Sequence, residues 1–282
     1  MKYLAALSLG AIIFLLFSGN SSWCAELSEK QPVASISIGG EYSSGSYNSG
    51  SPIRSFYMPL IAGWYPTERF DMSVELPFIY QTGSQVTTSI YQTTAATTVS
   101  KSVARRGGAG GTSGGGGTGI PGVYGLGDII LRAGYIPLFE TNSLPQLRTS
   151  LFVKTPTASV SDGLGTGEFD FGGGFDLSKW FGNLHLAGEA LYTYQGKVSG
   201  FGLNNYLSYS GTVGYQVTES LQPMIVIKGA TAPSTYSDDL LEARGRLLWT
   251  LTPATAVDLF VSGGISKSSP DYAGGIAVIY SF

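Results

Sequence analysis

Tyr272-Ala273-Gly274-Gly275-Ile276-Ala277-Val278-Ile279-Tyr280-Ser281-Phe282 ends the chain and decides its fold class. Apart from Gly274, the even positions are large and apolar or aromatic, whereas the odd positions are mostly small. This period of two predicts a β-strand whose two faces meet different environments. An aromatic-rimmed last strand in a Gly-rich and Tyr-rich chain is typical of a bacterial outer-membrane β-barrel. The alternative is the edge strand of a soluble sandwich, whose apolar face looks inward.

Residues 1–25 predict a cleaved N-terminal signal peptide. Lys2 supplies the positive start, an apolar run follows from Leu4 to Phe17, and small residues lie near a cleavage point between Ser21 and Ala25. The run is shorter than the roughly 20 residues of a membrane-spanning helix. Cys24 is expected to leave with this segment, so the exported chain would hold neither a disulfide nor a thiolate metal site.

The composition argues against an ordinary soluble enzyme. The 282 residues include 40 Gly, 17 Tyr and 14 Phe, and only 12% of them are charged. The net charge is −3 and no dense basic patch occurs, so we expect no nucleic-acid partner. The run from Gly107 to Gly119 lacks the Gly-Lys-Ser/Thr ending of a phosphate loop. We therefore predict no cofactor and no metal site.

Alternating segments predict an all-β chain, an up-and-down antiparallel transmembrane barrel of about 12 strands that occupies 26–282 as one domain. The expected strands are 33–43, 52–65, 70–82, 125–138, 146–156, 168–178, 184–195, 204–217, 220–231, 240–251, 255–266 and 272–282. Tight turns alternate with longer polar loops, of which 83–124 is a long Gly-rich external loop. Short periplasmic turns and long external loops are typical of outer-membrane barrels, and the parity places both ends of the chain in the periplasm.

Side-chain parity assigns the faces of the expected strands. In 240–251, Glu242, Arg244 and Arg246 share one face, and Leu247 and Trp249 lie on the other. An arginine facing lipid near the bilayer midplane costs about 2–4 kcal/mol, so the charged face must line the lumen. Aromatic residues near the strand ends predict interfacial belts. The lower belt comprises Trp64, Tyr65, Tyr135, Trp180, Phe181, Tyr215, Trp249, Tyr280 and Phe282, and the upper belt comprises Tyr42, Tyr80, Tyr192, Tyr194, Tyr209 and Tyr272.

The same parity gives a set of candidate pore-lining residues. They are Glu75, Asp128, Arg132, Arg148, Lys154, Glu168, Asp170, His185, Glu189, Lys228, Glu242, Arg244, Arg246 and Asp258. The expected hairpin registers place Lys154 near Glu168, Lys228 near Glu242, and Arg246 near Asp258. These charges are expected to form ion pairs that hold the wall together, to guide a solute, or both. The arginines would bias passage toward anions or polarised aromatic compounds.

His185 is the only histidine and raises an alternative, an outer-membrane hydrolase. A four-residue turn would place it opposite Ser178, with Asp176 as a diagonal neighbour. The pair would face the lumen rather than lipid substrate, and Glu189 would lie about 13 Å away along the strand. A structural histidine is the preferred interpretation.

Gly125-Leu126-Gly127-Asp128-Ile129, Val153-Lys154-Thr155-Pro156-Thr157 and Gly163 to Asp170 occur in an order that resembles the outer-membrane proteins of the MetA-pathway of phenol degradation. The resemblance covers Gly125 to Phe282. It implies a transmembrane barrel that passes small, often aromatic or hydrophobic, compounds.

We therefore expect a bacterial outer-membrane channel or transporter, not an enzyme, with a narrow charged lumen for small, aromatic or hydrophobic solutes. The expected partners are outer-membrane lipid, a small-molecule solute, and the barrel-insertion machinery, which would contact the strand that ends at Phe282. A structural or surface-interaction barrel without transport is the main alternative. The hydrolase using His185 is the second.

Overall fold

The computed structural model describes residues 32–46, 52–82, 88–90, 93–95 and 122–282, and all regular elements in these residues are β-strands. The strands are β1 (Ala34–Gly45), β2 (Ile53–Thr67), β3 (Phe70–Thr82), β4 (Thr88–Ile90), β5 (Thr93–Ala95), β6 (Gly122–Leu126), β7 (Ile130–Leu138), β8 (Gln146–Lys154), β9 (Asp170–Phe181), β10 (Leu184–Tyr194), β11 (Tyr206–Tyr215), β12 (Leu221–Ala230), β13 (Leu240–Thr252), β14 (Thr255–Gly264) and β15 (Tyr272–Ser281). Within these residues, no helix has the length and apolar character needed to cross a membrane.

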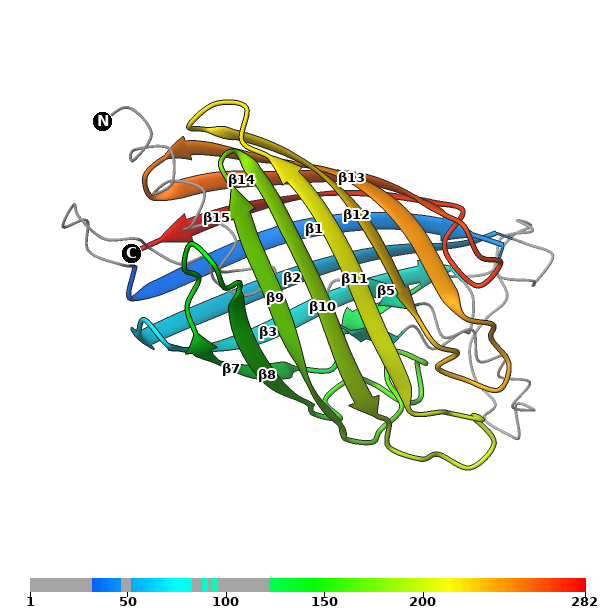
Figure 1. The fold of residues 1–282 in the computed structure, drawn as a ribbon. Coiled ribbons are helices and arrows are strands. Elements are labelled where there is room, and N and C mark those ends of the chain that lie inside the picture. Colours follow the sequence, from blue (N-terminus) through cyan, green and yellow to red (C-terminus); the bar gives the residue numbers. More distant parts are fainter. Residues whose placement is uncertain (1–31, 47–51, 83–87, 91–92, 96–121) are drawn as a thin grey trace.

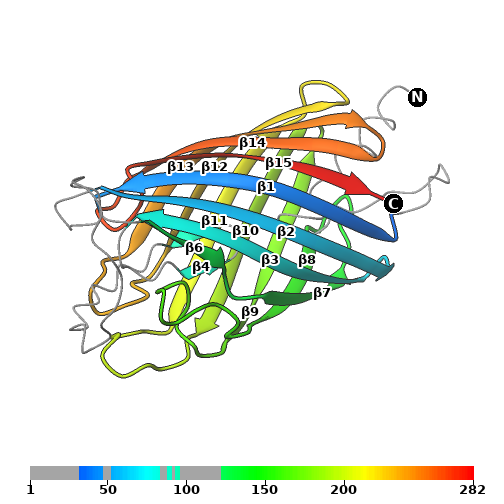
Figure 2. The same ribbon diagram turned by 180° about the vertical axis from the view of Figure 1, so that it is seen from behind.

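The strands close into one antiparallel barrel. Neighbours in sequence pair with each other around the wall, and β1 pairs with β15 to close it. Figure 1 and Figure 2 show the tilted strands from two sides, with β1 next to β15 in both views. Strands β6 and β7 share one position beside β3, so the wall has 12 strand positions. Strands β4 and β5 form a separate two-stranded sheet.

Alternation along each strand separates an apolar exterior from a polar interior. In β8, Gln146, Arg148, Ser150, Phe152 and Lys154 are buried, and the residues between them are exposed or half-buried. Exposed positions on other strands include Phe175, Ile225 and Val261, which are 49%, 64% and 70% exposed. Because the exposed positions are apolar and the buried positions carry charge, the exterior fits lipid and the charged face lies inside. The predicted assignment of the faces is confirmed.

The strand predicted over 125–138 is interrupted. Gly127 donates its backbone N–H to Pro77 in β3, at 2.8 Å, and the regular ladder resumes only at Ile130. In the gap, Ile129 donates its N–H to the hydroxyl of Thr157, at 2.9 Å, and the Asp128 carboxylate accepts the N–H of Ala158, also at 2.9 Å. The loop after β8 therefore supplies the hydrogen bonds that the wall loses at this point.

Most of the expected belt aromatics lie on the outside at the strand ends, where they are 38–63% exposed. Two are different. Tyr65 shares the lumen face of β2 and hydrogen-bonds the hydroxyl of Ser35 at 3.0 Å. Trp180 shares the lumen face of β9 and packs on His185, with ring centroids 4.5 Å apart. Their predicted place in the belt was wrong. It was based only on their position near a strand end, whereas strand alternation places both side chains inside.

The two ends of the barrel differ in the length of their connections. At one end, here called the turn end, strands are joined by short segments such as Gly182-Asn183, where Gly182 has a φ of 62°. At the loop end, longer segments include 155–169, 195–205 and 231–239. The expected signal peptide, 1–25, lies outside the described residues, and so does most of the expected external loop 83–124. The described parts of that loop are β4, β5 and the start of β6.

Candidate functional site

The candidate residues converge on the barrel interior, with one exception. Strand parity and burial place the others on the lumen face, from β3 round to β14. Glu168 is exposed and precedes β9, which begins at Asp170. Its expected position in the lumen and its expected pairing with Lys154 are therefore wrong, because β9 starts two residues later than predicted.

One ion cluster joins β3, β8 and β9. Arg148 donates through Nε and Nη2 to the two oxygens of Asp71, at 3.0 and 2.6 Å, and through Nη1 to Asp176, at 3.0 Å. Next to it, Arg132 pairs with Glu75 at 2.6 Å, and the Tyr57 hydroxyl also donates to Glu75. These side chains are almost completely buried, so losing one partner would leave an uncompensated charge.

A second ion cluster lies at the loop end of β8. Lys154 contacts Asp128 at 2.9 Å and Asp170 at 2.8 Å, and its side chain is only 3% exposed. Asp170 also accepts the backbone N–H of Gly196, at 2.9 Å. The ammonium group of Lys154 therefore links Asp128, in the interruption between β6 and β7, to Asp170 at the start of β9.

A third group of charges occupies β12, β13 and β14. Lys228 pairs with Glu242 at 2.9 Å, and Arg246 pairs with Asp258 at 2.6 Å, both in the register expected from the sequence. Arg244 lies 3.1 Å from Glu242 and stacks on Phe260, with its guanidinium carbon 3.6 Å from the ring centroid. Each of the three cations thus has an acidic neighbour.

Acidic side chains outnumber basic ones on the described lumen face, nine to six. The acids are Glu41, Asp71, Glu75, Asp128, Asp170, Asp176, Glu189, Glu242 and Asp258, and the bases are Arg132, Arg148, Lys154, Lys228, Arg244 and Arg246. Glu41, Asp71 and Asp176 are absent from the candidates chosen by sequence. All three lie at positions that strand alternation assigns to the inside of the barrel, and this alternation was the sequence signal that could have identified them. The expected anion bias rested on the arginines, and this charge balance gives it no support.

The loop 155–169 folds into the interior. Leu164 and Ala158, which are 3% and 7% exposed, pack on Tyr57 and Ile79 of the lumen face. The amide nitrogen of Gln81 donates to the Gly163 carbonyl at 3.3 Å. Part of the lumen beside β2 and β3 is therefore filled by this loop, whereas the long polar loops were expected outside the barrel. The single large apolar residue in a Gly-rich segment, Leu164, was the signal for it.

A cavity remains in the lumen next to this loop, between β1, β2 and β10 to β15. It holds about 110 Å³ and is lined by charged groups, including Glu189, Lys228, Arg244 and Arg246. Apolar and aromatic lining comes from Tyr57, Val226 and Phe260, and small hydroxyl groups come from Ser208, Ser210 and Thr212. Such a mixture of apolar walls and a few polar groups is the usual make-up of a small-molecule site.

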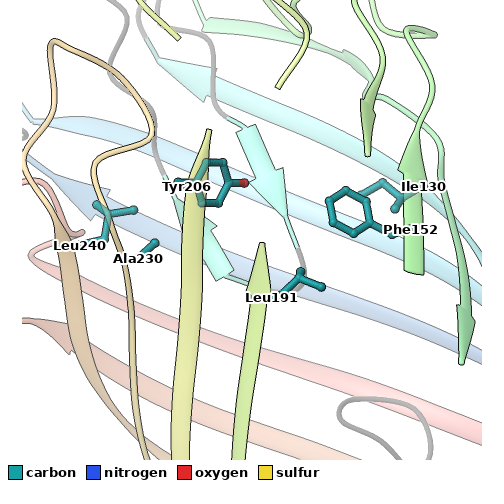
Figure 3. Close-up of a cluster of buried hydrophobic side chains, with 6 residues drawn as sticks. All are labelled: Ile130, Phe152, Leu191, Tyr206, Ala230 and Leu240. Carbon is teal, nitrogen blue, oxygen red and sulfur yellow. The ribbon is translucent and has the colours of Figure 1, made fainter. Parts of the chain in front are cut away.

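Apolar side chains also occur inside the barrel. Figure 3 shows a cluster on the lumen side whose members come from several neighbouring strands: Ile130, Phe152, Leu191, Tyr206, Ala230 and Leu240. A smaller cluster joins Met224, Leu248, Ala256 and Ile279. The interior is thus partly packed, which narrows it compared with a water-filled porin.

His185 is fully buried and faces Trp180 rather than Ser178. The turn between β9 and β10 has two residues between the paired Phe181 and Leu184, so the expected four-residue register was wrong. Ser178 pairs with Ala187, and Asp176 is held by Arg148. Among these described residues, Ser178, His185 and Asp176 therefore do not form the arrangement that a nucleophilic site requires.

A comparison of the sequence with models of protein families identifies the family of this chain, and the matching region includes most of the interior just described. The family model described as "Putative MetA-pathway of phenol degradation" matches residues 84–282, which include β6 to β15 and most of the lumen charges. The chain belongs to this family. A comparison with curated proteins gives no match.

Solved structures of outer-membrane channels have the same fold. The COG4313 outer membrane channel from Pseudomonas putida F1 is similar with a TM-score of 0.62 and 13% identity, covering 91% of this chain and 100% of that one. The KdgM porin, solved in complex with disordered oligogalacturonate, has a TM-score of 0.53 and 10% identity, with 88% and 99% coverage. The NanC porin has the same TM-score and identity, with 88% and 100% coverage. The barrel with its apolar exterior belongs in the bacterial outer membrane.

Proposed function

We propose that this member of the phenol-degradation family is an outer-membrane channel for small solutes with an aromatic or other apolar part. The cavity beside β10 to β15 is the observation that carries the proposal. Its volume of about 110 Å³ is of the same order as the ~150 Å³ apolar cavity that holds one benzene molecule in a protein core. The family description and the channel folds of the solved relatives support the same function.

The strand number also supports a narrow passage. Barrels of about 8 strands have interiors filled by side chains, whereas porins of 16–18 strands leave an aqueous channel. Twelve positions lie between these limits, and loop 155–169 with the inward apolar clusters reduces the free space further. These features favour a selective passage for small molecules over a general diffusion pore.

Filling the cavity tests the channel directly. Ser210 is a small lumen residue of β11 that lines the cavity, so Ser210→Trp is expected to reduce single-channel conductance in planar bilayers several-fold. Val213 lies on the lipid face of the same strand and is 51% exposed, so Val213→Trp is the matched control. Absence of conductance in the unmodified protein would reject the channel. Growth of a deletion strain on a series of aromatic carbon sources then narrows the solute class.

A closed structural barrel is the second candidate, and the packing of Leu164 against Tyr57 and Ile79 favours it. Stable insertion without conductance or solute uptake would support this function. The hydrolase receives no support from the register, because His185 lies opposite Trp180. Unchanged hydrolysis in a His185→Ala variant would dismiss it.

A further inference from the structure

We propose that Glu189 gives the lumen cavity a preference for cationic solutes, in particular for an ammonium group attached to a small apolar body. The inference rests on the proposed channel function and names the solute class for the same cavity. It is opposite in sign to the anion preference expected from the arginines in the sequence.

Glu189 occupies a central place on the lumen face. Cross-strand pairing joins it to Ser210 of β11, Ser210 to Lys228 of β12, and Lys228 to Glu242 of β13. All four side chains point to the same side of the wall, because directly paired residues share a face. Glu189, Ser210 and Lys228 line the cavity.

The cations of this cavity are already neutralised by protein carboxylates. Lys228 pairs with Glu242, Arg244 lies near Glu242 and Glu41, and Arg246 forms a bidentate pair with Asp258. A solute anion would have to compete with carboxylates held at 2.6–3.1 Å in most of these pairs. These cations therefore offer little net attraction to an anion.

Glu189 differs from the other charged residues of the lining. Within the described part of the chain, neither a hydrogen bond nor an ion pair within 4.0 Å involves its carboxylate. Its paired neighbour across the β9 ladder is Asp176, another acid. Arg132, Arg148 and Lys228 act on it electrostatically from further away, but each of them contacts a different carboxylate directly. Among the described residues that line the cavity, the Glu189 carboxylate is thus the acidic group that a solute cation can bind without breaking an existing ion pair.

The rest of the lining suits the apolar part of such a solute. Tyr57, Val226 and Phe260 border the same space. Because the Tyr57 hydroxyl is engaged by Glu75, its ring is held in place on this wall. An ammonium group beside Glu189 with its body against these side chains would satisfy both the charge and the apolar surface.

Ion selectivity provides the first test. In planar bilayers with a KCl gradient, we expect the reversal potential of the unmodified protein to show that K⁺ permeates better than Cl⁻. The isosteric Glu189→Gln variant should lower the ratio of the two permeabilities by about threefold or more, because it removes one unit charge from a low-dielectric passage. Glu219→Gln makes the same chemical change at an exposed turn, and it should leave the ratio unchanged. Preference for Cl⁻ in the unmodified protein, or an equal ratio in Glu189→Gln, would overturn the proposal.

Organic ions of one size provide the second test. Benzylammonium should block the K⁺ current of the unmodified protein at lower concentration than benzoate, and Glu189→Gln should remove this difference. Equal block by the two ions would contradict the role of Glu189 even if the channel conducts. Lack of any current in the unmodified protein would instead reject the channel function itself. Glu189→Gln relieves the repulsion from Asp176, so we expect it to assemble normally.

Discussion

Arg148 on β8 reaches past the intervening strand β7 to bind both carboxylate oxygens of Asp71 on β3, at 2.6 and 3.0 Å. Gly134 of β7 lies beneath this contact, directly paired with Asp71 in the ladder. A Cβ atom at Gly134 would lie 2.1 Å from Nη2 of Arg148 and 2.4 Å from the Asp71 carboxylate. The ion pair across β7 therefore depends on the absence of a side chain at position 134.

Gly134→Ala is expected to destabilise the barrel. The new methyl group would displace the guanidinium from Asp71, and breaking a buried pair typically costs about 3–5 kcal/mol. Unfolding in detergent by urea or heat measures the change. Gly211→Ala is the matched control, because no atom lies within 4 Å of a Cβ at that position. Equal stability of the two variants would contradict the role assigned to Gly134.

Leu164→Ala is expected to increase channel conductance. Removing the side chain takes away the apolar contact that holds loop 155–169 on Tyr57 and Ile79, and a buried Leu→Ala change typically costs about 2–5 kcal/mol. The loop should then leave the lumen more often, which single-channel recording detects as larger or longer openings. Val160→Ala changes a residue of the same loop that is 40% exposed. A comparable effect of both changes would show that docking of Leu164 does not control the passage.

Neighbouring residues of β11 allow a test of the two faces. Val213 faces lipid and Thr212 lines the cavity. Val213→Arg should make folding into vesicles less favourable by about 2–4 kcal/mol if it lies near the bilayer midplane. Thr212→Arg should have a smaller effect on folding, because its charge meets the polar lumen, but it should reduce conductance. Equal folding of both variants would mean that the lipid face has been misassigned.

The C-terminal aromatic residue gives a prediction about assembly. Phe282 is 63% exposed and packs edge-to-face on Tyr280, with centroids 4.9 Å apart. We expect deletion of Phe282 to lower the amount of assembled protein in the outer membrane by impairing contact with the insertion machinery. Refolding of the same variant from urea into detergent micelles should be little changed. If both yields fall together, Phe282 serves the stability of the barrel rather than its delivery.

Alternation along the strands was enough to predict the barrel and its faces. Glu242, Arg244 and Arg246 lie inside, and Trp249 lies outside. Alternate residues of a strand point to opposite faces, and charged side chains are unfavourable in lipid, so the charged face can only point into the barrel. The same rule predicted the pairs Lys228–Glu242 and Arg246–Asp258, because the strands of these hairpins begin and end close to the predicted residues.

Contacts that depend on loop conformation could not be predicted in this way. Lys154 binds Asp170 and Asp128 instead of Glu168, because loop 155–169 delays the start of β9 and the strand breaks at Asp128. His185 meets Trp180 because the turn is shorter than expected, for which Gly182 with its positive φ was the available signal. Alternation shows which face of a strand a residue lies on, but not how far it is from residues on strands that are not its neighbours. The contact between Arg148 and Asp71 could therefore not be predicted from the sequence and is seen only in the folded barrel.

The pairing of β1 with β15 has a consequence for how the protein is made. The first strand of the wall cannot find its second neighbour until the last strand has been synthesised and exported. During that interval β1 presents Ile36, Ile38 and an open row of backbone groups, which is a template for aggregation. We therefore expect the nascent polypeptide to need a periplasmic chaperone that shields this edge until the cylinder is sealed.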